Sequence, residues 1–254
     1  MPVLPVFIMC ATVAAIVLSI EAGHQVGLHH WFGARQKTGA YSTIEAAIFG
    51  LMGLLIAFTF YGAAARFDIR RNLIVQEANA IGTAYLRLDL LPPEVQPELR
   101  VDFRKYVTSR LAVHRKIPDM QAVKAELARS KALQDQIWKK AVAGTKTVSP
   151  AAQSLVLGAL NEMIDITTVR TVAGTTHPPL PVFAMLGLSV LISAVLAGYG
   201  MSASGVRDWV STIAFTLVLS TAVYIILDYE FPRIGIIRID PVDEVLVQTL
   251  EQMK

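Results

Sequence analysis

Four long stretches without a single charged residue constrain this chain most. They cover residues 3–20, 46–65, 180–206 and 209–227. A helix that crosses about 30 Å of hydrocarbon needs about 20 apolar residues, and all four stretches are near or above that length. Of all residues, 54% are hydrophobic and 17% are charged, against roughly 45–50% and about 25% in soluble domains. The sequence therefore predicts an all-α integral membrane protein with four transmembrane helices.

A secretory signal peptide is the alternative interpretation of the first stretch. Such a peptide carries Lys or Arg in its first few residues, and residues 1–6 have neither. We therefore expect an uncleaved transmembrane helix. The single cysteine, Cys10, lies inside this stretch, so one chain has no cysteines to pair in a disulfide framework or a Cys-based zinc site.

The distribution of Lys and Arg predicts the topology. Residues 66–178 hold 17 of the 23 basic residues, and Arg66, Arg70 and Arg71 directly follow the second stretch. Because positive charge favours the cytoplasmic side of a membrane, we expect an inner (cell) membrane protein whose termini and central region are cytoplasmic. The net charge of +3 reflects this bias and calls for no nucleic-acid partner.

Four regions follow from this topology. They are a first transmembrane hairpin (1–65), a cytoplasmic helical domain (66–178), a second hairpin (179–229) and a cytoplasmic tail (230–254). The second transmembrane helix has no proline until residue 92, so it is predicted to continue past Arg66 to Leu91, where Pro92-Pro93 ends it. Apolar residues at helical spacing predict three more helices in the domain, and only one short stretch resembles a strand. These segments are 94–115, 120–142 and 151–173 for the helices and 235–239 for the strand-like stretch.

No catalytic or metal site is predicted. The chain has no Walker loop, no G-x-S-x-G and no H-E-x-x-H motif, and its four apolar stretches contain no Asp, Glu, Lys, Arg or His. The outer loop, residues 21–43, contains His24, His29 and His30 near Glu21, with Trp31 as an expected interfacial anchor. Without a second ligand cluster, we interpret this as an ordinary exposed loop and predict no metal and no cofactor.

Two motifs carry a resemblance to a known family. Residues 58–71 (FTFYGAAARFDIRR), followed by residues 77–87, form the first, and residues 227–238 (LDYEFPRIGIIR) form the second. Together they resemble the bacterial DUF4239 family of bestrophin-like membrane proteins, and the resemblance covers nearly the whole chain in order. Its candidate polar residues are Asp68, Glu77, Asn79 and Arg87 in the first motif, and Asp228, Glu230, Pro232 and Arg233 in the second.

A more distant resemblance links the chain to the bestrophins, which are pentameric ion channels with four transmembrane helices per subunit. It implies a hydrophobic neck on the second helix formed by Leu54, Phe58 and Gly62, although Gly50 departs from the bulky residue of bestrophins. It also implies a homo-oligomer, a pentamer, that lies in a lipid bilayer and passes small ions. The acidic residues of the calcium clasp of animal bestrophins are only scattered here, so no calcium is predicted.

The spacing of the candidate neck residues is consistent with a pore-lining helix. Leu54, Phe58 and Gly62 follow each other at i, i+4 and i+8, so five copies would form a constriction that gates by dewetting. We expect Arg66 and Arg70 to continue roughly this face and, with Arg71, to line a basic inner mouth that favours anions. Asp68 and Glu77 would oppose that preference if they too faced the ion path.

Other functions fit the same residues. Leu54 and Phe58 could be ordinary lipid-facing or core side chains, and the three arginines could be a positive-inside anchor. The chain would then be a membrane-anchored adaptor or sensor whose cytoplasmic domain binds a partner. An enzyme acting on lipid has the least support, since the sequence shows no catalytic motif.

Overall fold

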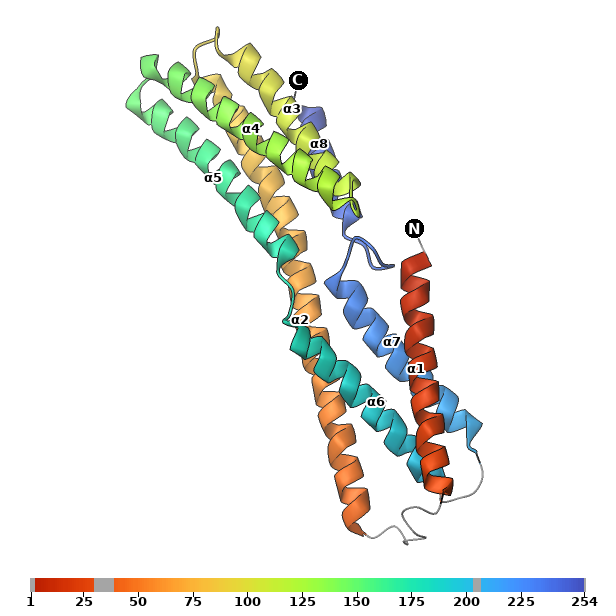
Figure 1. Ribbon diagram of the computed structural model, residues 1–254. Coiled ribbons are helices and arrows are strands. Elements are labelled where there is room, and N and C mark those ends of the chain that lie inside the picture. The colour runs from red at the N-terminus through yellow and green to blue at the C-terminus, as the bar shows by residue number, and fades with distance from the viewer. Residues whose placement is uncertain (1–2, 30–38, 203–206, 254) are drawn as a thin grey trace. The chain divides into compact units, whose positions relative to one another are not determined.

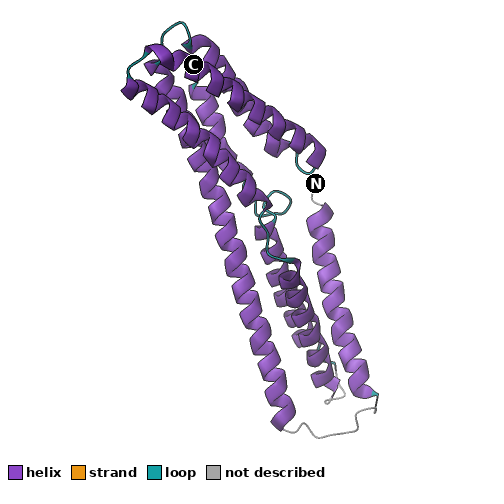
Figure 2. Cartoon of the chain, turned by 60° about the vertical axis from the view of Figure 1, so that its left-hand side comes forward, coloured by secondary structure: helices purple, strands orange, loops and turns teal. Residues whose placement is uncertain are grey.

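The computed structural model describes residues 3–29, 39–202 and 207–253, and nearly all of them are helical (Figures 1 and 2). The chain divides into two compact units. The first unit comprises residues 1–66 and 177–237, and the second comprises residues 67–176 and 238–254. The three described ranges contain no strand. The strand-like stretch 235–239 is therefore corrected: residues 235–237 and 239 form bends.

The first unit contains the four apolar helices. These are α1 (Val3–Leu28), the beginning of α2 (Gly39–Leu86), α6 (Leu180–Ser202) and α7 (Trp209–Glu230). Each is long and apolar enough to cross a membrane, which confirms the four predicted membrane helices. Helix α2 is one unbroken helix that contributes residues to both units (Figure 1).

Helix α1 continues beyond the charge-free stretch that predicted it. Glu21 does not end the helix, which runs to Leu28, and Gln25 one turn later donates a hydrogen bond to the Glu21 carboxylate at 2.7 Å. His24 is therefore a buried helical residue, and the Nδ1 of His29 lies 3.0 Å from the carbonyl oxygen of Gln25. The predicted outer loop 21–43 thus loses its first residues to α1 and residues 39–43 to α2. His30 and Trp31 lie outside the described residues.

Apolar side chains from all four helices form the core of the first unit. The main cluster is Ile16, Ile20, Met52, Val190, Ala194 and Leu219. A smaller cluster near the end of α7 is Ala63, Leu186 and Ile226. Helices α1 and α6 pack most closely of all: a Cβ at Gly198 would overlap the carbonyl oxygen of Ile20, and one at Gly23 would overlap that of Val195. Glycine at both positions lets the two backbones meet.

The second unit is a helical domain built around the last part of α2. It adds α3 (Gln96–Arg115), α4 (Met120–Gly144), α5 (Pro150–Thr175) and the short α8 (Glu244–Gln252), with single 3₁₀ turns at 87–90, 145–147 and 240–243. Its core includes Phe103, Ile137 and Leu160, and the C-terminal segment adds Ile239, Leu246 and Met253. The end of the chain is therefore part of this unit's core.

Local sequence signals explain where these helices start and stop. The carboxylate of Asp119 accepts the amide hydrogens of Gln121 and Ala122 and so caps α4, and Ser149 caps α5 ahead of Pro150. Helix α2 ends at Leu86, and a 3₁₀ turn follows before Pro92. All three helices predicted for this region are present, within a few residues of their predicted bounds.

Candidate functional site on helix α2

Helix α2 has a packed face whose residues recur every seven positions. In the first unit this face carries Phe49, Ile56 and Ala63, which pack in the two apolar clusters. In the second unit the same series continues with Arg70 and Glu77, both of which are buried. Because seven residues complete almost two turns of an α-helix, each of these side chains points about 20° from the one before it.

The opposite face of α2 lacks packing partners within the described chain. Leu54, Phe58 and Tyr61 expose 51%, 66% and 74% of their surface. Gly62 and Arg66 beyond it are both mostly covered. Further along, Asp68, Asn72 and Asn79 are exposed on this face, and Ile69 and Val75 are exposed at its edges. The candidate neck residues Leu54 and Phe58 thus lie on one bare, apolar surface of the helix.

The two arginines expected to continue this surface do not lie on it. Each step of four residues advances about 40° around an α-helix, so Arg70 points about 160° away from Leu54. The structure agrees with this geometry, because Arg70 is only 8% exposed. Its Nε and Nη2 donate to the carbonyl oxygens of Ala173 and Thr176 at 3.0 and 2.8 Å. Arg70 therefore donates hydrogen bonds to carbonyl groups at the C-terminal end of α5, where such groups lack partners within the helix.

Arg66 is paired with a buried carboxylate. Its guanidinium donates to Oε2 of Glu230, with Nε at 2.8 Å and Nη2 at 2.7 Å. His177 holds the other oxygen of Glu230, with Nδ1 2.8 Å from Oε1, and its ring stacks on Phe231. The missing side chain of Gly62 makes room for this arrangement, since a Cβ there would lie 3.3 Å from Nη1 of Arg66. The positive charge of Arg66 is therefore balanced locally.

The polar residues of the first motif separate in the structure. Asp68 and Asn79 are exposed, and Nη1 of Arg87 donates to the carbonyl oxygen of Leu155 at 2.7 Å. Arg71 is exposed as well. Glu77 alone enters the core of the second unit. The four residues therefore do not form one cluster.

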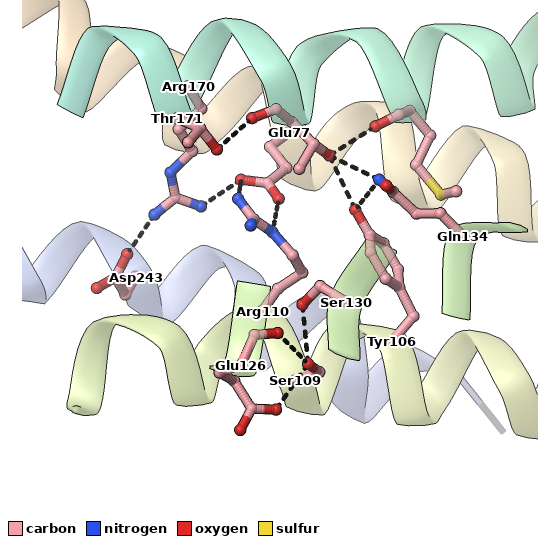
Figure 3. Close-up of polar contacts among 12 residues, drawn as sticks. Glu77, Tyr106, Ser109, Arg110, Glu126, Ser130, Gln134, Arg170, Thr171 and Asp243 are labelled. Atoms are coloured by element: carbon pink, nitrogen blue, oxygen red, sulfur yellow. Dashed lines mark hydrogen bonds and ion pairs between the residues drawn. The ribbon is translucent and has the colours of Figure 1, made fainter. Parts of the chain in front are cut away.

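Glu77 lies at the centre of a buried network (Figure 3). Its carboxylate accepts from Nε and Nη2 of Arg110 at 2.5 and 3.2 Å and forms a second ion pair with Arg170. Arg170 also donates to Asp243 at 3.0 Å. Sequence reasoning missed all three partners. A signal for the first existed, because Arg110 follows Phe103 by seven residues and so occupies the apolar stripe of α3.

Two further polar groups adjoin this network. Gln134 donates to the hydroxyls of Tyr106 and Thr167 at 3.0 and 3.1 Å, and Ser109 donates to Glu126 at 2.7 Å (Figure 3). Burial, together with the charge of Glu77, raises the pKa of Tyr106 to about 12. Burial lowers the pKa of Arg110, but the Glu77 carboxylate outweighs it and the pKa is raised. Except for the half-buried Thr167, these polar groups are buried inside the second unit.

The second motif forms a closed turn after α7. Asp228 is buried and accepts the amide hydrogens of Ile236 at 2.9 Å and of Ile237 at 2.7 Å. A side chain at Gly235 would overlap this carboxylate. Pro232 is buried in the same turn, and Arg233 is half-buried. Asp228 thus pins the turn, while Glu230 holds Arg66.

The described residues contain no group of three His, Cys, Asp or Glu side chains that could hold a metal ion. The carboxylate of Asp228 accepts two backbone amide hydrogens, and that of Glu230 bonds two side chains. The acidic residues of the second motif therefore have structural partners.

Comparison with known proteins decides the family. The family model of the bestrophin-like domain matches residues 10–243 of this chain. The chain belongs to the bestrophin-like family. Solved structures agree with this bestrophin-like assignment at the level of the fold. A point variant of a bacterial bestrophin homologue from Klebsiella pneumoniae superposes with a TM-score of 0.68 at 14% identity, covering 98% of each chain.

A second structure, described as a point variant of a membrane protein, gives a TM-score of 0.67 at 15% identity over 98% of this chain and 97% of that one. A search of curated proteins finds no match to the bestrophin-like chain. The predicted bestrophin-like resemblance and the predicted all-α membrane fold are confirmed. The narrower DUF4239 assignment stays a prediction.

Proposed function

We propose that this bestrophin-like protein is an oligomeric ion channel whose path is lined by the exposed face of α2. The observation that carries the proposal is the row of bare apolar side chains at Leu54, Phe58 and Tyr61. These side chains stand on a helix whose other face is packed against its own chain. Membership of the bestrophin-like family supports this function over catalysis.

In the proposed assembly, copies of α2 surround an axis. Leu54 and Phe58 would then form a hydrophobic constriction, which blocks ions when it empties of water and passes them when it widens. Five copies are proposed because bestrophins are pentamers. Gly62 would leave the path wider below Phe58, since glycine adds no side chain.

We also propose the orientation that the basic residues indicate. The region between the second and third membrane helices holds most of the Lys and Arg, so the second unit and both termini would lie in the cytoplasm of a cell with this protein in its inner membrane. Helix α2 would then link the membrane path to the cytoplasmic unit without a break.

The anion preference inferred from a basic inner mouth loses its support. It required Arg66 and Arg70 to face the path, but Arg66 is paired with Glu230 and Arg70 binds backbone carbonyls. The hydrophobic constriction does not depend on either arginine.

Liposome flux tests the constriction. Phe58→Ala should raise the flux of a small ion because it widens the narrowest apolar segment. The matched control is Phe60→Ala, two residues away on the same helix, whose ring packs edge-on against Tyr229 at 5.7 Å between centroids. That change should not raise flux. Equal flux in wild type and Phe58→Ala, with the assembly intact by mass, would refute the neck assignment.

The mass of the protein in mild detergent tests the assembly itself. A monomer or dimer would exclude a path surrounded by α2. If no ion crosses and a soluble protein copurifies through residues 67–176, the membrane-anchored adaptor is the better function.

A further inference from the structure

We propose that Asp68 sets the charge at the inner end of this path and that the path prefers cations. The inference rests on the proposed function, namely that the exposed face of α2 lines an ion path. It adds the class of ion, which follows from where the charged side chains of α2 lie around the helix.

Asp68 is the first charged residue on the exposed face of α2. It follows Leu54 by two steps of seven residues, with Tyr61 between them, so the three side chains point within about 40° of one another. All three are exposed, and Asp68 has no ion-pair partner among the residues that the structure describes. The face continues with Asn72 and Asn79, which carry no charge.

The nearby arginines do not offset this carboxylate. Arg66 points about 120° away from Leu54, and the buried carboxylate of Glu230 balances its charge at 2.7 Å. Arg70 is buried on the far side, where it binds the carbonyl oxygens of α5 and of the residue that follows it. Arg71 is exposed and lies about 60° round the helix from Asp68 and about 100° from Leu54, and it forms no ion pair with Asp68 among the described residues. The charge that remains on the path-lining face is therefore negative.

A ring of carboxylates is a common selectivity element of cation channels. In a closed assembly each copy would add one Asp68 to such a ring, below the constriction at Leu54 and Phe58. The ring would raise the local concentration of cations and lower that of anions. No residue of the exposed face supplies a compensating positive charge.

The permeability ratio of potassium to chloride tests this inference. It is measured from the reversal potential of the full-length protein in planar bilayers under a KCl gradient. We expect a ratio above one for wild type and a several-fold fall for Asp68→Asn. Arg71→Gln is the matched control, one turn away and also exposed, and it should leave the ratio nearly unchanged.

A second pair of variants tests the balance of Arg66. Glu230→Gln should shift the ratio toward chloride, because it leaves Arg66 without its counter-charge. Replacing both residues, as Arg66→Gln with Glu230→Gln, should restore the wild-type ratio because the pair is neutral as a whole.

The outcomes separate this inference from the proposed function. A chloride-preferring wild type, or an unchanged ratio in Asp68→Asn with current intact, would overturn the role of Asp68 while leaving a channel. A complete absence of current in wild type would overturn the channel itself. A potassium-to-chloride permeability ratio that falls only in Asp68→Asn and in Glu230→Gln would support both the channel function and the role of Asp68.

Discussion

Removing the charge of Glu77 should destabilise the second unit strongly. The Glu77 carboxylate is 0% exposed, and its partners Arg110 and Arg170 are 1% and 6% exposed. Glu77→Gln keeps the shape of the side chain but leaves two buried guanidinium groups facing a neutral amide. Arg170 keeps Asp243, whereas Arg110 loses the only carboxylate that pairs with it among the described residues.

The size of the effect follows from the cost of an uncompensated buried charge. Breaking a buried ion pair from one side costs about 3–5 kcal/mol. At roughly 2–4 °C per kcal/mol for a protein of this size, the melting temperature should fall by about 6–20 °C. The Glu77 network is buried and joins three helices to the segment before α8. Its disruption should therefore lower the free energy of unfolding of the whole second unit.

Tryptophan fluorescence can report on this unit alone. The chain has three tryptophans, and Trp138 packs against the core of the second unit. Changing Trp31 and Trp209 to Phe leaves Trp138 as the only reporter in a thermal melt of the detergent-purified protein.

Glu98→Gln is the control for this experiment. Glu98 forms a surface ion pair with Lys140 at 3.0 Å and its side chain is 74% exposed, so its loss should change the melting temperature little. A Glu77→Gln melt as close to wild type as that of Glu98→Gln would refute the reasoning. Changing both Glu77 and Arg110 to Met should recover part of the loss, because the double change leaves fewer charges stranded.

Three further predictions concern packing, pH and the turn after α7. Gly198→Ala should cost about 1–3 kcal/mol by overpacking the α1–α6 contact, measured as a lower melting temperature, whereas Gly187→Ala on the same helix has open space and should not. The hydrogen bond from Lys116 lowers the pKa of Glu126, so its stabilisation is present above the unfolded pKa and is lost as the pH falls through the folded pKa. The melting temperature of wild type should therefore fall more than that of Glu126→Gln below about pH 4.3. Asp228→Ala should free two backbone amides and speed proteolysis of the turn; unchanged protection would argue against its pinning role.

The sequence by itself determined the helices and the membrane segments. Charge-free stretches of sufficient length predict spans because hydrocarbon excludes charge. Proline and cap residues such as Asp119 and Pro150 act on the backbone next to them, so the bounds of α4 and α5 were predictable to within a few residues. Helix α2 was predicted to run to Leu91, whereas it ends at Leu86 and a 3₁₀ turn covers residues 87–90. The family motifs likewise singled out Glu77, Asp228 and Glu230, without indicating what each one contacts.

Only the tertiary structure decided which charges are exposed and which are paired. Arg66 and Arg70 have the same side chain and stand one turn apart, yet one pairs with a carboxylate of α7 and the other binds the end of α5. The spacing of residues along one helix does not indicate partners that lie about a hundred residues or more away in the sequence. Small angular steps also accumulate along a helix as long as α2, so a pattern that holds between Leu54 and Phe58 has turned to the opposite face by Arg70.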